Sequence, residues 1–193
     1  MKEELVWSCI KDYCLLFLLL WLLVYLIVKL YAGRFRVKSF YGFLVISAVV
    51  YIVLFLFVTL LGRGFMEYRS YELSFLWEYR LAFGMKDGIP RIQSREWVGQ
   101  IRDNILLFVP MGVLYGELAV GLIRHSVKRG LLFRPSWRNA LFTGFLISTG
   151  VETAQLVSRL GMFEFDDMLN NTIGMLAGYG YFVFCNILYK KWR

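Results

Sequence analysis

The chain has 193 residues, about one domain in length, and its apolar share of 59% and mean hydropathy of +0.57 exceed what a soluble domain of this size can bury. Three cysteines (Cys9, Cys14 and Cys185) without paired spacing and a single histidine, His125, argue against a disulfide framework, a sulfur metal site and a histidine-based zinc centre. The net charge of +8 is explained by anionic lipid headgroups, because no aromatic-basic motif points to nucleic acid.

Five apolar runs are long enough to cross a bilayer core, which needs roughly 20 helical residues. They cover residues 13–32, 40–61, 104–123, 139–158 and 168–189. The first run is too long for the apolar part of a signal peptide, so we interpret it as a span, with Lys29 near its end reaching back to the headgroups. These runs predict an all-α polytopic membrane protein in two parts, residues 1–103 and residues 104–193.

Basic residues predict how the spans are oriented. They concentrate in residues 33–39, in residues 124–138 and in the C-terminal tail, whereas residues 159–167 carry one arginine against three acids. Because short cytoplasmic loops are enriched in Lys and Arg, we expect the N-terminus outside and the C-terminus inside. Residues 62–103 are then an extracellular segment of nearly balanced charge between spans two and three.

Residues 71–83 (YELSFLWEYRLAF) are the aromatic-rich part of that segment. Glu78 and Arg80 interrupt them, so the stretch is too short and too charged to span a membrane. One interpretation places it at the membrane interface, with Trp77 and Tyr79 at headgroup depth. The other is an ordinary amphipathic packing segment.

The fourth predicted span carries a stripe of small and polar residues. Its members are spaced four, four, three and four residues apart, which places them on one helical face: Gly144, Ser148, Glu152, Gln155 and Arg159. Glu152 lies 14 residues after Arg138, about 20 Å along a helix, and so below the outer interface. A carboxylate at that depth marks a functional site by default, although bonding to Arg159 or Asn104 would make it structural.

The neighbouring spans supply further polar and small residues. In the third span Asn104 precedes Pro110, which leaves the Leu106 carbonyl without its usual partner, and Gly112 follows. In the fifth span a carboxylate and an amide stand above a GxxxG face that favours close helix packing: Asp167, Asn171, Gly174 and Gly178. Helix capping explains either Asp166 or Asp167, but not both.

These residues predict one pocket on the outer side of spans three to five, lined by Asn104, Glu152, Gln155, Arg159, Asp166, Asp167 and Asn171. Oxygen and amide groups suit a hydroxyl-rich or amide-rich headgroup, or a hard cation such as Mg²⁺ or Ca²⁺. No cofactor is otherwise indicated. A carboxyl group whose pKa is raised by burial, beside an ionised one, also suits acid-base chemistry.

The same residues resemble the VanZ-like family of small membrane proteins. The resemblance rests on three motifs between residues 104 and 179, which are Asn104-x3-Phe108-x-Pro110-x-Gly112, Glu152-x2-Gln155 with Arg159, and Phe163-x2-Asp166-Asp167-x3-Asn171-x2-Gly174-x3-Gly178. Glu164 and Asn170 depart from the usual pattern by adding polarity. The resemblance implies a bacterial plasma membrane protein with a role at the cell envelope. The namesake of the family is linked to resistance to the glycopeptide teicoplanin, which does not by itself carry over to this chain.

Three functions remain open at this point. The first is a protein that binds a lipid-linked or lipopeptide ligand at its outer face, such as a membrane lipid, a cell-wall precursor or a lipoglycopeptide. The second is an intramembrane enzyme with Glu152 and Asp167 as catalytic acid and base, and the third is a structural accessory subunit. A transporter is disfavoured because five spans contain no inverted repeat. We expect neutralisation of Glu152 or Asp167 to abolish function, and neutralisation of Glu164 to do little.

Overall fold

The structure is a computed structural model that describes residues 2–31, 37–61, 63–83, 91–124 and 135–192. His125, most of the basic loop before residue 135 and the side chains of Cys9 and Cys14 lie outside the part described. Six α-helices form the described chain: α1 (Lys2–Tyr31), α2 (Val37–Leu56), α3 (Trp77–Ala82), α4 (Arg91–Arg124), α5 (Trp137–Ser158) and α6 (Phe165–Trp192). One turn of π-helix, η1 (Phe57–Leu61), continues α2, and strands β1 (Tyr71–Glu72) and β2 (Phe163–Glu164) pair in parallel.

Four of the predicted spans correspond to helices that are long and apolar enough to cross a membrane. They cover Phe40–Leu61, Arg95–Gly121, Trp137–Ser158 and Phe165–Trp192, while the described apolar part of α1, Leu16–Tyr31, is shorter. The all-α membrane class is therefore confirmed. Helix α4 begins well before the predicted third span, and a division of the chain at residue 103 would cut through it.

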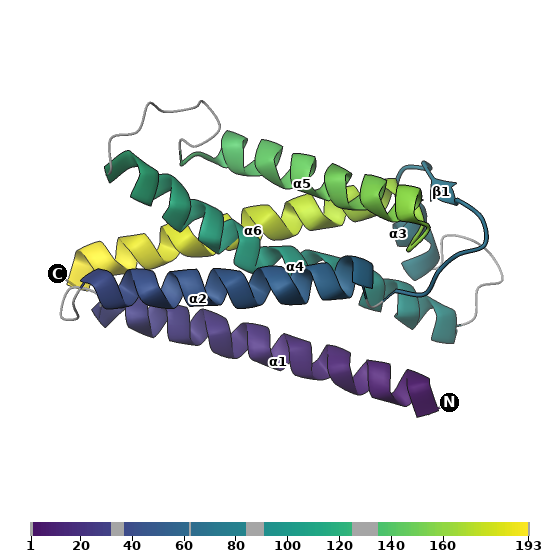
Figure 1. Ribbon diagram of the computed structural model, residues 1–193, viewed down its shortest axis with the longest axis horizontal. Coiled ribbons are helices and arrows are strands. Elements are labelled where there is room, and N and C mark those ends of the chain that lie inside the picture. Colours follow the sequence, from purple (N-terminus) through teal and green to yellow (C-terminus); the bar gives the residue numbers. More distant parts are fainter. Residues whose placement is uncertain (1, 32–36, 62, 84–90, 125–134, 193) are drawn as a thin grey trace.

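Helices α4 and α6 cross at the centre of the molecule, with α5 on one side and α1 and α2 on the other (Figure 1). The crossing is close because glycines face backbone carbonyls. A Cβ atom on Gly178 would lie 1.9 Å from the Val109 carbonyl oxygen, and one on Gly174 would lie 2.0 Å from that of Ile105. Gly112 faces the Met175 carbonyl in the same way, and Pro110 is buried inside α4 beside this contact. Close packing at small residues thus holds α4 and α6 together, because the hydrophobic effect does not drive helices to associate in lipid.

Figure 1 also shows which helix ends lie together. The N-terminus, α3 and β1 lie at one end of the bundle, and the C-terminus lies at the other. The main buried core runs between these ends and includes Phe55, Phe108, Tyr115, Ala140, Met175, Tyr179 and Phe182. Cys185 is buried in a second core cluster, next to α1 and α2. One end of this bundle therefore gathers the charged segment that precedes α4.

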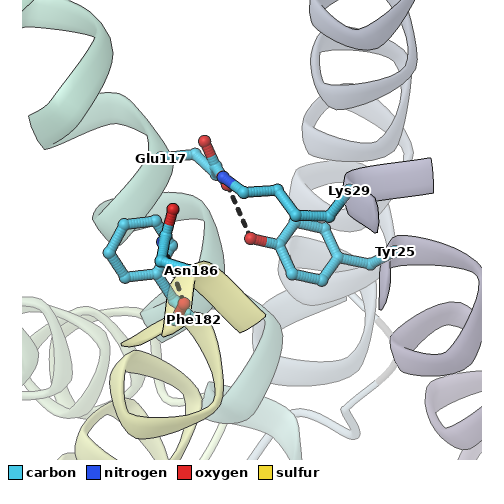
Figure 2. Close-up of polar contacts among 5 residues, drawn as sticks. All are labelled: Tyr25, Lys29, Glu117, Phe182 and Asn186. Atoms are coloured by element: carbon cyan, nitrogen blue, oxygen red, sulfur yellow. Dashed lines mark hydrogen bonds and ion pairs between the residues drawn. The ribbon is translucent and has the colours of Figure 1, made fainter. Parts of the chain in front are cut away.

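Lys29 differs from its sequence prediction. Its side chain is 9% exposed and ion-paired with Glu117 of α4, whose Oε1 atom also accepts a hydrogen bond of 2.6 Å from the Tyr25 hydroxyl (Figure 2). The ammonium group lies 5.3 Å from the ring centre of Phe40 and 5.4 Å from that of Phe182. Lys29 therefore does not reach back to the headgroups, because a carboxylate and two aromatic rings inside the bundle hold its charge.

Candidate functional site

Asp166 fixes the start of α3. Leu76, before the first helical residue, has a left-handed backbone with φ 56° and no side-chain cap from its own segment. The Asp166 carboxylate instead accepts hydrogen bonds from the backbone N–H groups of Leu76 (2.7 Å) and Glu78 (3.0 Å). Asp166 is thus a helix cap, but for α3 rather than for its own helix, and this ties the segment before α4 to α6.

Glu78 is the polar centre of α3 and is fully buried. Its Oε1 atom accepts a 2.7 Å hydrogen bond from the Gln100 side-chain amide of α4, and its Oε2 atom accepts one of 3.0 Å from Asn170 of α6. The Tyr79 hydroxyl donates to the Asn170 oxygen over 2.5 Å. Three elements distant in sequence therefore meet at one carboxyl group.

Glu78 belongs to a cluster of three buried carboxyl groups. Glu78, Glu164 and Asp167 each offer an oxygen atom, and these atoms all lie within 4.8 Å of one another. Gln100 donates a second hydrogen bond, of 2.9 Å, to Glu164, and Asn104 donates to Asp167. We call these three residues the carboxylate cluster. Like charges this close do not all ionise, so the cluster suits shared protons or a bound cationic group.

Glu152 adjoins the cluster through the backbone. Its Oε2 atom accepts a 3.1 Å hydrogen bond from the Glu164 N–H, and Asp167 lies within its electrostatic range. One turn deeper, the Asn171 amide donates to the Ser148 hydroxyl over 2.8 Å. Nearer the end of α5, Gln155 donates to the Thr59 carbonyl over 3.0 Å. The predicted stripe of α5 therefore faces the bundle interior as far as Gln155.

Arg159 is the predicted site residue that the structure places apart. It ends α5 in a left-handed conformation with φ 59°, and its side chain is exposed. The guanidinium group lies 5.8 Å from the ring centre of Phe65, and the Arg159 carbonyl accepts a 2.8 Å hydrogen bond from the Met66 N–H. Arg159 thus anchors the segment after η1 and makes no ion pair with the described carboxylates, Glu152 included.

Burial controls the protonation of the two carboxyl groups that lie outside the apolar helices. Desolvation raises the pKa of Glu78, and the neighbouring negative charges of Asp167 and Glu164 raise it further. Desolvation and the Asp167 charge also raise the pKa of Glu164, while the hydrogen bond with Glu78 and the charge of Arg63 lower it. The two groups therefore have unlike environments, and Glu78 holds its proton more strongly.

Sequence reasoning missed Glu78, Gln100 and the central position of Glu164. Glu164 was expected to matter little, yet it is buried within the cluster because β2 pairs with β1 and turns its side chain inward. Gln100 stands four residues before Asn104, on the same face of α4, and this spacing was a usable signal. The sequence signal for Glu78 was weaker, because it is only a single acidic residue inside an aromatic-rich stretch.

Fold and site together define a helical membrane protein with buried carboxyl and amide groups at one end of its bundle. The family model described as VanZ/LLP1 matches residues 16–186, and the chain belongs to this family. The match extends well beyond the motifs of residues 104–179 and includes α2, α3 and Glu78. No curated protein and no solved structure was found to match the chain.

Proposed function

We propose that this protein binds a lipid-linked or lipopeptide ligand at the outer face of the bacterial plasma membrane, and so contributes to protection against lipophilic glycopeptides such as teicoplanin. The observation that carries the proposal is the carboxylate cluster, three buried carboxyl groups held by side-chain amides from two apolar helices. Such groups are costly to bury, and a protein that only packs its helices does not need them.

The distribution of basic residues supports an outer location for the cluster. The end of the bundle opposite α3 holds Lys38, Arg124, Arg138, Lys190 and Lys191, at the first or last turns of their helices. Near the cluster, arginines alternate with carboxylates instead. Under the positive-inside rule the basic end faces the cytoplasm, which gives the N-out, C-in topology and places α3 and the cluster outside.

The chemistry of the site suits a headgroup rich in hydroxyl, amide or ammonium groups. Carboxylates accept hydrogen bonds strongly, and the side-chain amides of Asn104, Asn170 and Asn171 both donate and accept. Asn171 has a buried oxygen without a hydrogen-bond partner in the described structure. A ligand that brings donors to this site therefore satisfies acceptors that the protein leaves open.

An enzyme acting on a lipid-linked headgroup is the second candidate. It is favoured by the raised pKa of Glu78, which keeps a proton available beside carboxyl groups that lose theirs more easily. In this version Glu152 and Asp167 are the acid-base pair, and Glu78 is a buried neighbour of Asp167.

The test neutralises carboxylates without changing their shape. Glu152→Gln, Asp167→Asn and Glu78→Gln are expressed in a teicoplanin-sensitive host, with Glu67→Gln as the matched control because Glu67 is exposed at the same end of the bundle. We expect these three variants, at two residues of the cluster and at the adjoining Glu152, to lose protection and the control to keep it. Accumulation of folded protein is measured in parallel.

The outcomes separate the three functions. If the protein is a binder, each variant should lose affinity for a labelled lipoglycopeptide or lipid-linked precursor in proportion to the protection that it loses. An enzyme variant still binds but no longer converts the headgroup, which mass spectrometry of extracted lipids detects. Variants that accumulate normally and protect like the parent would overturn the proposal, and variants that fail to accumulate while the control does not would favour a packing role.

A further inference from the structure

Arg63 lies at the rim of the site and is not used by the proposal above. It follows η1, its side chain is exposed, and it forms no ion pair with another described side chain. Its Nη1 atom lies 2.8 Å from the position that a Cβ atom on Gly161 would occupy. Its positive charge reaches Glu152, Glu164 and Asp167. The Arg63 guanidinium group thus lies near the buried carboxylate cluster but forms no ion pair with its described carboxylates.

Gln155 presents a second unsatisfied group at the same place. Its side chain is 1% exposed, and its Oε1 atom has no hydrogen-bond partner in the described structure. The amide nitrogen is held by the Thr59 carbonyl at 3.0 Å, which leaves Oε1 as the open atom. That oxygen lies 3.2 Å from the same Cβ position on Gly161. A buried acceptor without a donor costs about 1–3 kcal/mol, so it favours a ligand that supplies one.

Gly161 lets the Arg63 and Gln155 side chains lie close to the turn. It is buried in the turn between α5 and β2, and a side chain there would meet both Arg63 and Gln155. Its backbone is not in the left-handed region, so the need for glycine at this position is one of space. The turn therefore brings a cationic donor and a neutral acceptor side by side.

We propose that Arg63, Gly161 and Gln155 form a subsite for a phosphate-linked polar headgroup. The Arg63 guanidinium binds a phosphate oxygen, and Gln155 Oε1 accepts a hydrogen bond from a hydroxyl or ammonium group of the same headgroup. The carboxylate cluster repels phosphate, so Arg63 sets where the anionic part of the ligand lies. This inference rests on the proposed ligand-binding function and names the chemical class of the ligand. The phosphate belongs either to a membrane-anchored lipid or to a soluble phosphoester.

The experiment uses the full chain purified in a phosphate-free maltoside detergent. The probes are ethanolamine phosphate, inorganic phosphate, dihexanoyl phosphatidylethanolamine and ethanolamine without phosphate. Binding is followed by tryptophan fluorescence, because Trp77 and Trp97 pack 4.8 Å apart between their ring centres, next to Glu78 and Gln100. The variants are Arg63→Gln and Gly161→Ala, with Arg69→Gln as the matched exposed arginine and Glu152→Gln as a probe of the carboxylate site.

We expect Arg63→Gln and Gly161→Ala each to lower the affinity for the phosphate-containing probes about ten-fold or more. Arg69→Gln should leave these affinities unchanged. Ethanolamine binding should be equal in parent and Arg63→Gln. Binding of the lipid alone supports a membrane source of the phosphate, and equal binding of ethanolamine phosphate supports a soluble source.

Three results would overturn the inference. If Arg63→Gln and Gly161→Ala bind every phosphate probe like the parent while Glu152→Gln does not, the subsite is wrong and the proposed function stands. If the parent binds no phosphate probe, the phosphate assignment fails, and ethanolamine binding then decides whether the carboxylate site survives. If the parent binds none of the probes, neither assignment stands for this class of headgroup.

Discussion

Two polar regions lie inside this apolar bundle, and they differ in how their charges are balanced. Near the basic end, one ammonium group meets one carboxylate, Lys29 with Glu117, and a tyrosine hydroxyl and two aromatic rings complete the enclosure. Near the α3 end, three carboxyl groups lie within 4.8 Å of one another, and neutral amides rather than cations hold them in place. Arg63, whose positive charge reaches Glu164 and Asp167, is exposed at the rim.

This is the difference that we expect between a structural polar site and the proposed ligand site. In the Lys29 region every charge has a partner from the chain itself, and the pair joins α1 to α4 without needing a ligand. In the carboxylate cluster the chain supplies an excess of acceptors, so protons, a cation or a ligand must complete it. Burial alone does not identify a site, and the unbalanced charge is the more useful sign.

The largest expected effect is on the balanced pair. Glu117→Leu leaves the Lys29 ammonium group buried without its counter-ion, which should cost about 3–5 kcal/mol of stability. The double variant Lys29→Met with Glu117→Leu should recover most of this loss, because no charge remains buried. Thermal unfolding of the purified chain in detergent measures both. A double variant as unstable as the single one would mean that the pair has a role beyond charge balance.

A smaller loss should follow from separating the helices that carry the two regions. Gly178→Ala places a Cβ atom 1.9 Å from the Val109 carbonyl oxygen, so α4 and α6 must move apart, at a cost of about 1–3 kcal/mol. Gly150→Ala is the matched control, because Gly150 has open space around its Cβ position. Alanine there should stabilise α5 slightly. Equal melting temperatures for the two variants would contradict the close helix contact.

The pH dependence of stability should distinguish the two regions. The pKa of Glu78 and that of Glu164 are raised in the folded protein, so the folded state holds more protons than the unfolded state. Stability is then highest at acid pH and falls as the pH rises above the ordinary carboxyl range, by about 1.4 kcal/mol per pH unit for each proton that the folded state retains. Melting temperatures across this range test the sign. Glu78→Gln should flatten the slope, and the Lys29→Met, Glu117→Leu double variant should keep it.

The smallest expected effect is stabilisation by a hard cation at the cluster. Mg²⁺ or Ca²⁺ at a concentration equal to its Kd should add about 0.4 kcal/mol, and the gain should grow with pH as the carboxyl groups ionise. Glu164→Gln should remove this gain, while Glu67→Gln should not. A melting temperature that does not respond to either cation at pH 8 would mean that protons or a ligand, and not a metal ion, complete the cluster.

The sequence by itself determined the membrane class, the faces of the helices and the family. Composition and run length predict apolar helices, and the steps of three and four residues place Ser148, Glu152 and Gln155 on the buried face of α5. The glycines of α6 follow the same rule and meet α4. These inferences succeed because helical periodicity is local, so each residue's face is set by neighbours one turn away.

Only the tertiary structure decided which polar groups meet. Glu78 is hydrogen-bonded to Asn170, 92 positions away in the sequence, and Lys29 is paired with Glu117, 88 positions away. Asp166 caps a helix that begins about 90 residues earlier. No periodicity encodes these pairings, because they depend on how segments far apart in the sequence pack against one another. The tertiary structure also leaves Arg159 exposed beside Phe65 at the end of α5, whereas Glu164, on the strand that pairs with β1, is buried in the carboxylate cluster.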